Sequence, residues 1–219
     1  MAHRELFQNL TIQGDKNVLE LFRDGLNKVV LPADWHRNTD FESRWLEQLG
    51  REQRFVRVFA YCGNNHPRAN VWLFGDDSEM HVGNIVPSET NKISPFEYNN
   101  IVRLFHTSVL RAFSENLTGL NIELGPDRES IEDLTTTRVL DALRSFSVHA
   151  NKSTGNSHPY DNDRWRTFVI HAARDNCRLD SGFLSSWLIA DGWSEEWADK
   201  LAKPVLGARN PARSTQKTT

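Results

Sequence analysis

Residues 55–86 read FVRVFAYCGNNHPRANVWLFGDDSEMHVGNIV and decide the fold of the first half of the chain. Aromatic and β-branched side chains recur at every second position in Phe55–Cys62, and shorter runs of the same kind follow at Val71–Phe74 and Met80–Val86. This period indicates strands, because successive side chains of a strand point to opposite faces. The segments GNNHPR and GDDS between the runs are rich in turn formers. The stretch therefore predicts an antiparallel meander of three strands.

The residues before this meander predict a short strand and two amphipathic helices. The strand is expected within residues 5–12, and Asp15 is placed to accept the first amides of the first helix. Thr39 and Glu42 have the spacing of a capping box at the start of the second helix. The apolar residues of the first helix lie three or four positions apart on one face: Val18, Leu21, Phe22 and Leu26.

The residues after the meander predict one long helix and a further strand. Ser94, Pro95 and Glu97 form a capping box with proline in the first turn, so a helix is expected to run to about Leu117. The segment Leu120–Leu124 reads as a strand. The order of these elements predicts an α+β fold, in which an antiparallel or mixed sheet of about four strands has flanking helices. This sheet region is expected to span residues 1–125, with Arg54, Arg57, Trp72 and His81 on outer strand faces.

The second half of the chain predicts a bundle of about four helices over residues 126–203. Whether this bundle packs on the sheet as one domain is left open by the pattern. The polar and basic segment 204–219 is predicted to be disordered. The expected helix starts are marked by short polar residues at Thr137, Asp161, Asp180 or Ser181, and Ser194.

Composition limits the classes of function. The chain has 219 residues and a net charge of −3, so it carries no large basic field for nonspecific nucleic-acid binding. It has no signal-peptide pattern and no apolar run long enough to span a bilayer, so a cytoplasmic protein without membrane contact is predicted. Its two cysteines, Cys62 and Cys177, sit in apolar patterns and are expected to be buried free thiols. No cofactor and no metal site are predicted.

Residues 144–168 read RSFSVHANKSTGNSHPYDNDRWRTF and concentrate hydrogen-bonding side chains between two apolar helical patterns. The run lacks the earlier glycine that a P-loop requires, although its backbone amides could still form a nest for an anion. The same residue types are typical of a simple turn between helices, so both interpretations stay open. If the loop is functional, the binding residues are Asn151, Lys152, Ser153, Ser157, His158 and Arg164.

The spacing of Arg144 and His149 resembles the Arg-x4-His motif of HEPN-type ribonucleases. That resemblance implies a helical arginine and histidine beside a scissile phosphate. The strand-rich first half departs from that all-helical family. The resulting hypothesis is a nucleotide- or RNA-directed phosphodiester hydrolase with Arg144, His149 and His158 as catalytic candidates and Lys152 and Arg164 as phosphate-facing cations.

The segment 192–202, GWSEEWADKLA, resembles the loop and helix of UBA-like three-helix bundles, which implies a protein-binding module. Trp187, Trp193 and Trp197 would either fill the core of this helical hairpin or form a partner-binding patch. No catalytic motif with a specific spacing is present. The favoured hypothesis is therefore a non-enzymatic protein-interaction protein, regulatory or accessory to a bacterial intracellular system, whose partner is another protein.

Overall fold

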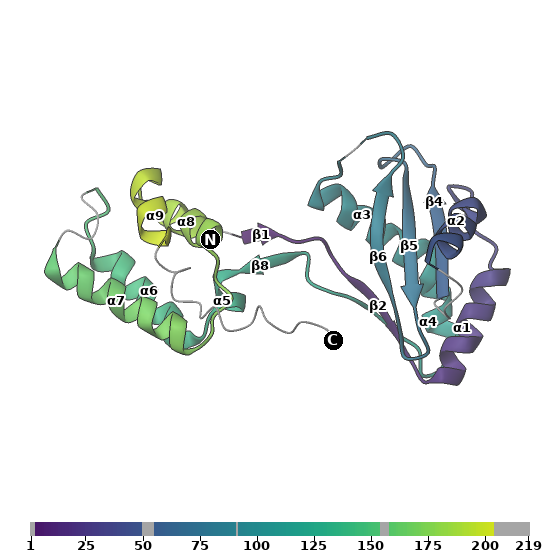
Figure 1. The fold of residues 1–219 in the computed structure, drawn as a ribbon, viewed down its shortest axis with the longest axis horizontal. Helices are drawn as coiled ribbons and strands as arrows, with labels where there is room; N and C mark the ends of the chain where they lie inside the picture. Colours follow the sequence, from purple (N-terminus) through teal and green to yellow (C-terminus); the bar gives the residue numbers. More distant parts are fainter. Residues whose placement is uncertain (1–2, 50–54, 91, 154–157, 204–219) are drawn as a thin grey trace. The chain divides into compact units, whose positions relative to one another are not determined.

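The computed structural model describes residues 3–49, 55–90, 92–153 and 158–203 (Figure 1). The chain divides into two compact units, here called the sheet unit, Glu5–Asp127, and the helical unit, which joins Met1–Arg4 to Arg128–Thr219. The predicted α+β class is confirmed, with an antiparallel sheet, flanking helices and C-terminal helices. No helix of the described segments is long and apolar enough to cross a membrane.

The sheet unit contains a six-stranded antiparallel sheet in the order β3-β4-β5-β6-β2-β7. The predicted meander forms its centre. The sheet has more strands than the four expected, because a three-residue strand such as β3 is too short to show a period. The bounds are β2 Leu10–Gln13, β3 Trp35–Arg37, β4 Phe55–Tyr61, β5 Ala69–Gly75, β6 Glu79–Pro87 and β7 Asn121–Leu124.

Two helices of the sheet unit begin at the predicted caps. Asp15 caps α1 and Ser94 forms the predicted capping box with Glu97 at the start of α3. The predicted box of Thr39 and Glu42 is wrong, because Asn38 Oδ1 accepts an amide of the first turn of α2 and the Glu42 side chain turns to the sheet. The bounds are α1 Lys16–Lys28, α2 Thr39–Leu49, α3 Pro95–Phe105, the π-helical segment η1 His106–Leu110 and α4 Arg111–Asn116.

The two faces of this sheet are covered differently. One face packs against α1, α3 and η1 and carries the main core of the unit. On the other face, α2 places Phe41 and Trp45 against Trp72, with ring centroids 6.0 and 5.4 Å apart. Trp72 was predicted on an outer face, and it lies there half-buried beneath α2 rather than free. Arg54 lies outside the described residues.

The helical unit also contains a short two-stranded sheet. After Pro126 the sequence predicts helix throughout, and this is wrong for Arg128–Ser130, which forms β8 and pairs with β1, His3–Glu5. The first residues of the chain therefore belong with its second half. Arg4 strengthens the link through ion pairs with Glu129 and Asp180. The helices are α5 Ile131–Leu134, α6 Thr137–His149, α7 Pro159–Arg174, α8 Ser181–Ala190 and α9 Glu195–Ala202.

Two caps of the helical unit agree with the sequence, and those of α5, α6 and α7 do not. Ser194 caps α9, as predicted, and Asp180 rather than Ser181 caps α8. Helix α7 begins at Pro159 with His158 as its cap, so Asp161 lies inside the first turn. The predicted disordered segment 204–219 lies outside the described residues. Cys62 is exposed rather than buried, and Cys177 is half-buried.

Candidate functional site

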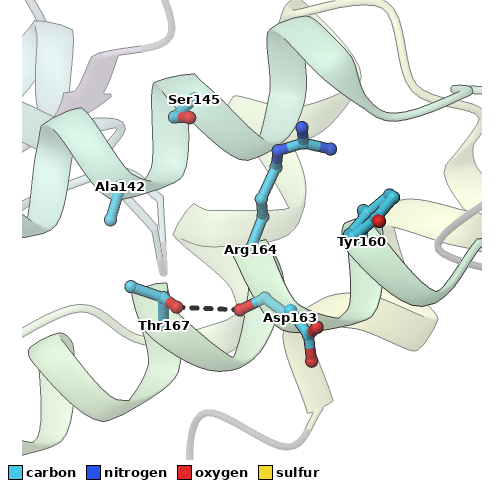
Figure 2. A pocket seen from close by; sticks show the side chains of 6 residues that line it. All are labelled: Ala142, Ser145, Tyr160, Asp163, Arg164 and Thr167. Carbon is cyan, nitrogen blue, oxygen red and sulfur yellow. Dashed lines mark hydrogen bonds between the residues drawn. The ribbon is translucent and has the colours of Figure 1, made fainter.

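A shallow groove of about 250 Å³ lies between α6 and α7 of the helical unit (Figure 2). It exists because the α6 side chains facing it are short: Ala142 and Ser145 are one turn apart on the same face of the helix. From α7, Arg164 reaches toward α6, and Thr167 lies one turn further along. The described residues that line the groove are Ala142, Ser145, Tyr160, Asp163, Arg164 and Thr167.

The polar side chains of the groove are positioned by local contacts within α7. Arg164 Nη1 donates to Asp161 Oδ1 at 3.0 Å, and Asp161 is buried. Thr167 Oγ1 donates to the backbone carbonyl of Asp163 at 2.8 Å, and Asp163 itself is exposed. Tyr160 is 68% exposed. The groove thus presents a carboxylate, a guanidinium and an aromatic ring within two turns of one helix.

The predicted binding residue Lys152 serves the fold of the helical unit. Its ammonium donates to Asp191 Oδ2 at 2.8 Å and to the Asp191 carbonyl at the end of α8. Burial opposes ionisation of Asp191, but hydrogen bonds from Lys152 and Ser147 outweigh it and hold the pKa of this carboxyl below its ordinary value. Ser147 is buried and accepts the indole N–H of Trp193 at 2.6 Å. Lys152 therefore closes a network that joins the end of α6 to the end of α8.

The three catalytic candidates also have local partners. Arg144 Nη2 donates to Glu132 Oε1 at 2.7 Å, which ties α6 to α5. His149 Nδ1 lies 2.8 Å from the Ser145 carbonyl of its own helix. His158 Nδ1 accepts the Tyr160 amide at 3.3 Å as the cap of α7. In the described part of the chain, the groove brings in Arg164 but none of these three side chains.

The rest of the predicted loop is partly described. Ser153 donates from its backbone amide and its hydroxyl to Asn151 Oδ1, at 3.0 and 2.7 Å. This is the side-chain turn that asparagine commonly forms two residues before a bend. Ser157 lies outside the described residues. Within the described segments, no group of three or more His, Cys, Asp or Glu side chains is arranged to hold a metal ion.

The tryptophans of the C-terminal hairpin belong to the core rather than to a surface patch. Trp187 and Trp193 are buried, and Trp193 stacks on Phe146 with ring centroids 5.1 Å apart. Trp197 is half-buried beneath the Lys200 ammonium, which lies 4.2 Å from its ring centroid. The hairpin therefore offers no exposed indole to a partner within the described residues.

The sequence predicted one residue of the groove, Arg164, and missed the others. Ala142, Ser145 and Thr167 are small residues with no chemical signal of their own. A signal was present only in their spacing, because small side chains one turn apart on a helix leave room beside a neighbouring helix. Tyr160 was hidden in the predicted cap region, since α7 starts earlier than expected.

Residues 136–217 match the model of a family described as a domain of unknown function (DUF1889). The match spans α6 to α9 and less than half of the chain, and it shows that this part is similar to that family. No curated protein and no solved structure matches the chain. The family description assigns no activity, so function rests on the geometry.

Proposed function

We propose that this chain is a non-enzymatic protein-interaction protein whose helical unit binds a segment of another protein in the groove between α6 and α7. The groove itself is the observation that supports the proposal. It is open to solvent, it lies beside the exposed ring of Tyr160, and two charged side chains of opposite sign line it. Tyrosine and arginine are the residue types that dominate the energetics of protein interfaces.

The partner segment is proposed to be a helix that presents one apolar side chain and a flanking carboxylate. A volume of about 250 Å³ holds one or two side chains rather than a cofactor. The Arg164 guanidinium donates one N–H to Asp161, and its remaining donors suit a carboxylate of the partner. Such an interaction is consistent with a regulatory or accessory subunit of a bacterial cytoplasmic system, which is the role that we propose.

The alternative proposal, a phosphodiester hydrolase, has less support. A hydrolase would need a histidine and cations that converge on one phosphate. His149 and His158 each bind the backbone of their own helix, while Arg144 and Lys152 bind carboxylates on other elements. Because these contacts use each group locally, the arrangement favours protein binding over hydrolysis.

The test is to fill the groove and compare the partners that remain bound. We expect Ser145→Trp to place an indole in the groove and to remove at least one protein that co-purifies with the wild-type chain. Ser186 is the matched control, because it is an exposed helical serine on α8 outside the groove. The measurement is quantitative mass spectrometry of co-purified proteins, with the fold of each variant checked by circular dichroism.

A protein retained by Ser186→Trp and by wild type, but reduced at least tenfold with Ser145→Trp, supports the proposal. That ratio corresponds to the loss of about 1.4 kcal/mol of binding free energy. An unchanged set of captured proteins with folded Ser145→Trp would show that the groove binds none of them, and the proposed function would be abandoned.

A further inference from the structure

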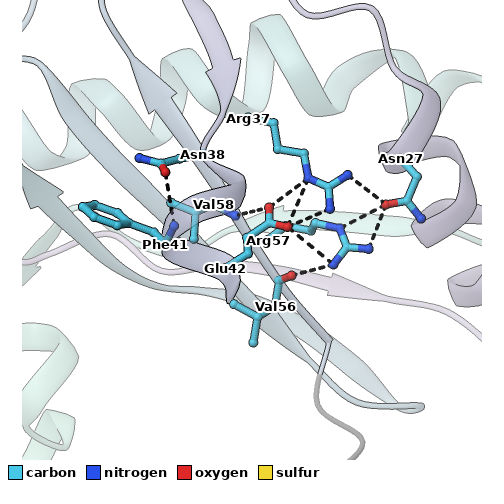
Figure 3. A network of polar contacts seen from close by, with 8 residues as sticks. All are labelled: Asn27, Arg37, Asn38, Phe41, Glu42, Val56, Arg57 and Val58. Carbon is cyan, nitrogen blue, oxygen red and sulfur yellow. Dashed lines mark hydrogen bonds and ion pairs between the residues drawn. The ribbon is translucent and has the colours of Figure 1, made fainter. Parts of the chain in front are cut away.

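The sheet unit also carries a polar cluster, beside the first residues of β4, which have no strand partner on this side among the described residues (Figure 3). Strand β3 pairs with β4 only from Phe59 to Tyr61. At the preceding residue of β4, Val58, the side chain of Glu42 from α2 accepts the backbone amide at 3.0 Å, as a strand carbonyl would. The Glu42 side chain is only 7% exposed. The cluster is therefore built on a buried carboxylate that closes an open sheet edge.

Two arginines face this one carboxylate, and they share it unequally. Arg37 binds Glu42 through Nε at 2.9 and 3.1 Å and through Nη2 at 2.7 Å, which is a bidentate pair. The hydrogen bonds to Glu42 raise the pKa of Arg37. Arg57 Nη1 comes no closer to the same carboxylate than 3.9 Å. The Glu42 carboxylate thus accepts its hydrogen bonds from Arg37 and the Val58 amide. The positive charge of Arg57 is in excess of the single negative charge in the cluster.

Arg57 is also held in a setting that disfavours an uncompensated cation. Its side chain is 18% exposed, and its guanidinium lies over the Phe55 ring at 4.4 Å from the centroid. Burial, and then the like charge of Arg37, lower its pKa, while Glu42 opposes them. A half-buried charge of this kind is usually paired. Here the neighbouring acceptors are neutral oxygens: the Val56 carbonyl at 2.7 Å and the Asn27 side chain.

The Asn27 amide oxygen receives three N–H groups from the two arginines. Arg37 donates from Nη1 at 3.2 Å, and Arg57 donates from Nε at 3.1 Å and from Nη2 at 2.8 Å. Figure 3 shows dashed lines from both guanidinium groups that meet at this oxygen. Asn27 is an exposed residue in the last turn of α1. A neutral oxygen on an exposed side chain therefore occupies the point where the donors of two guanidinium groups converge.

We propose that Arg37 and Arg57 form a binding site for a tetrahedral oxyanion such as phosphate, and that Asn27 Oδ1 occupies the position of one of its oxygens. The Nε and Nη2 edge of Arg57 suits two oxygens of one anion, and Arg37 Nη1 suits a third. A planar carboxylate has only two oxygens and cannot occupy all three directions. The stacking of Arg57 on Phe55 holds its guanidinium in place before binding, which reduces the conformational entropy that binding would cost.

Substitutions of Asn27 give the sharpest test, because they change the site without removing any buried group. The full chain is heated with and without inorganic phosphate, against sodium chloride of equal ionic strength, and its melting temperature is followed by circular dichroism. We expect phosphate to raise the melting temperature of wild type. The increase caused by phosphate should be larger for Asn27→Ala, because the competing oxygen is absent. Asn27→Asp supplies its own anion, so it should melt higher than wild type without phosphate and show no phosphate response.

The controls separate a specific anion site from general salt effects. Asn116, an exposed helical asparagine of α4 in the same unit, is the matched control, and its change to alanine should leave the phosphate response unchanged. Arg57→Met should weaken phosphate binding at least tenfold by isothermal titration calorimetry, because it removes charged hydrogen bonds. Equal stabilisation by acetate would overturn the tetrahedral ligand. No phosphate response in wild type and Asn27→Ala, with no rise in melting temperature for Asn27→Asp, would overturn the site.

Discussion

Each unit of the molecule has a polar network built around one carboxylate, Glu42 in the sheet unit and Asp191 in the helical unit, and the two differ in burial. The Glu42 side chain is 7% exposed and accepts the backbone amide of Val58 in β4. The Asp191 side chain is 39% exposed and receives Lys152 and Ser147 at the end of α8. The Glu42 carboxylate is therefore buried within the sheet unit, and the Asp191 carboxylate lies at the solvent-exposed side of its network.

This difference indicates where the stabilisation resides in each network. Removing the Glu42 carboxylate leaves the Arg37 guanidinium and the Val58 amide without their acceptor and Arg57 without its nearby negative charge, and buried groups without partners are costly. Removing an exposed carboxylate lets water replace it at little cost. In the helical unit the important contact is expected to be the inner one, between Ser147 and the Trp193 indole, because both residues are buried.

The largest expected effect is at Glu42. Glu42→Ala should destabilise the sheet unit by about 3 kcal/mol, since it leaves Arg37 and Arg57 facing each other without a counterion. The measurement is urea unfolding of the full chain followed by circular dichroism, together with hydrogen exchange of the Val58 amide. Exchange at Val58 should accelerate more than exchange at Val71, which lies on the central strand β5.

The matched control for this prediction is Glu42→Gln, which keeps an oxygen for the Val58 amide and removes the charge. It should protect Val58 better than Glu42→Ala while still lowering stability. If both variants unfold at the wild-type urea concentration, then the edge of β4 does not depend on Glu42, and the contrast between the two networks fails.

The second effect, at Ser147, tests whether the inner contact stabilises the helical unit. Ser147→Ala should cost about 1 to 3 kcal/mol, because the buried indole N–H of Trp193 loses its acceptor. Ser185→Ala is the matched control, since Ser185 is also a buried helical serine but donates outward to Asp199. Urea unfolding should show a smaller loss for Ser185→Ala. Equal losses would mean that the indole is not the reason for the Ser147 effect.

The same comparison explains which features the sequence could predict. Asp15, Ser94 and Ser194 were predicted as caps correctly, and Asp180 was one of two candidates for α8, because a cap depends on amides two or three residues away. Glu42 has an equally good local pattern, but its partners are Val58 and the edge of a sheet, which no local spacing reveals. The contact of Glu42 with the distant Val58 amide therefore replaced the capping box that its local spacing predicts.

The candidate sites follow the same rule. Lys152 was predicted to bind a ligand because its loop is polar, whereas its partner is Asp191, far along the chain. Of the groove between α6 and α7, only the charged Arg164 could be predicted among the described residues, since the space beside it depends on how two helices pair. Arg57 was expected on an outer strand face, but its excess charge is visible only once Glu42 and Arg37 are seen together.

The smallest expected effect is the pH dependence of the Asp191 network. The pKa of Asp191 is lowered in the folded chain, so the unfolded chain binds a proton more readily at this group. Its contribution is therefore fully present above the unfolded value of about 3.9 and is lost as pH falls through the lower folded value. Because the pair with Lys152 is exposed to solvent, the contribution is at most about 1 kcal/mol.

The measurement compares wild type with Asp191→Asn by urea unfolding at pH 7 and at pH 3. Wild type should be slightly more stable than the variant at pH 7, and the difference should shrink at pH 3, where the proton begins to compete with Lys152 for the carboxylate. Ser147→Ala should also reduce this pH dependence in part, because it removes the hydroxyl that donates to the Asp191 carboxylate and helps to lower its pKa. If the difference in unfolding free energy between wild type and Asp191→Asn were large at pH 7 and fell steeply toward pH 3, Asp191 would contribute as a buried carboxylate does, as Glu42 is expected to. Only a carboxylate shielded from water could contribute so much.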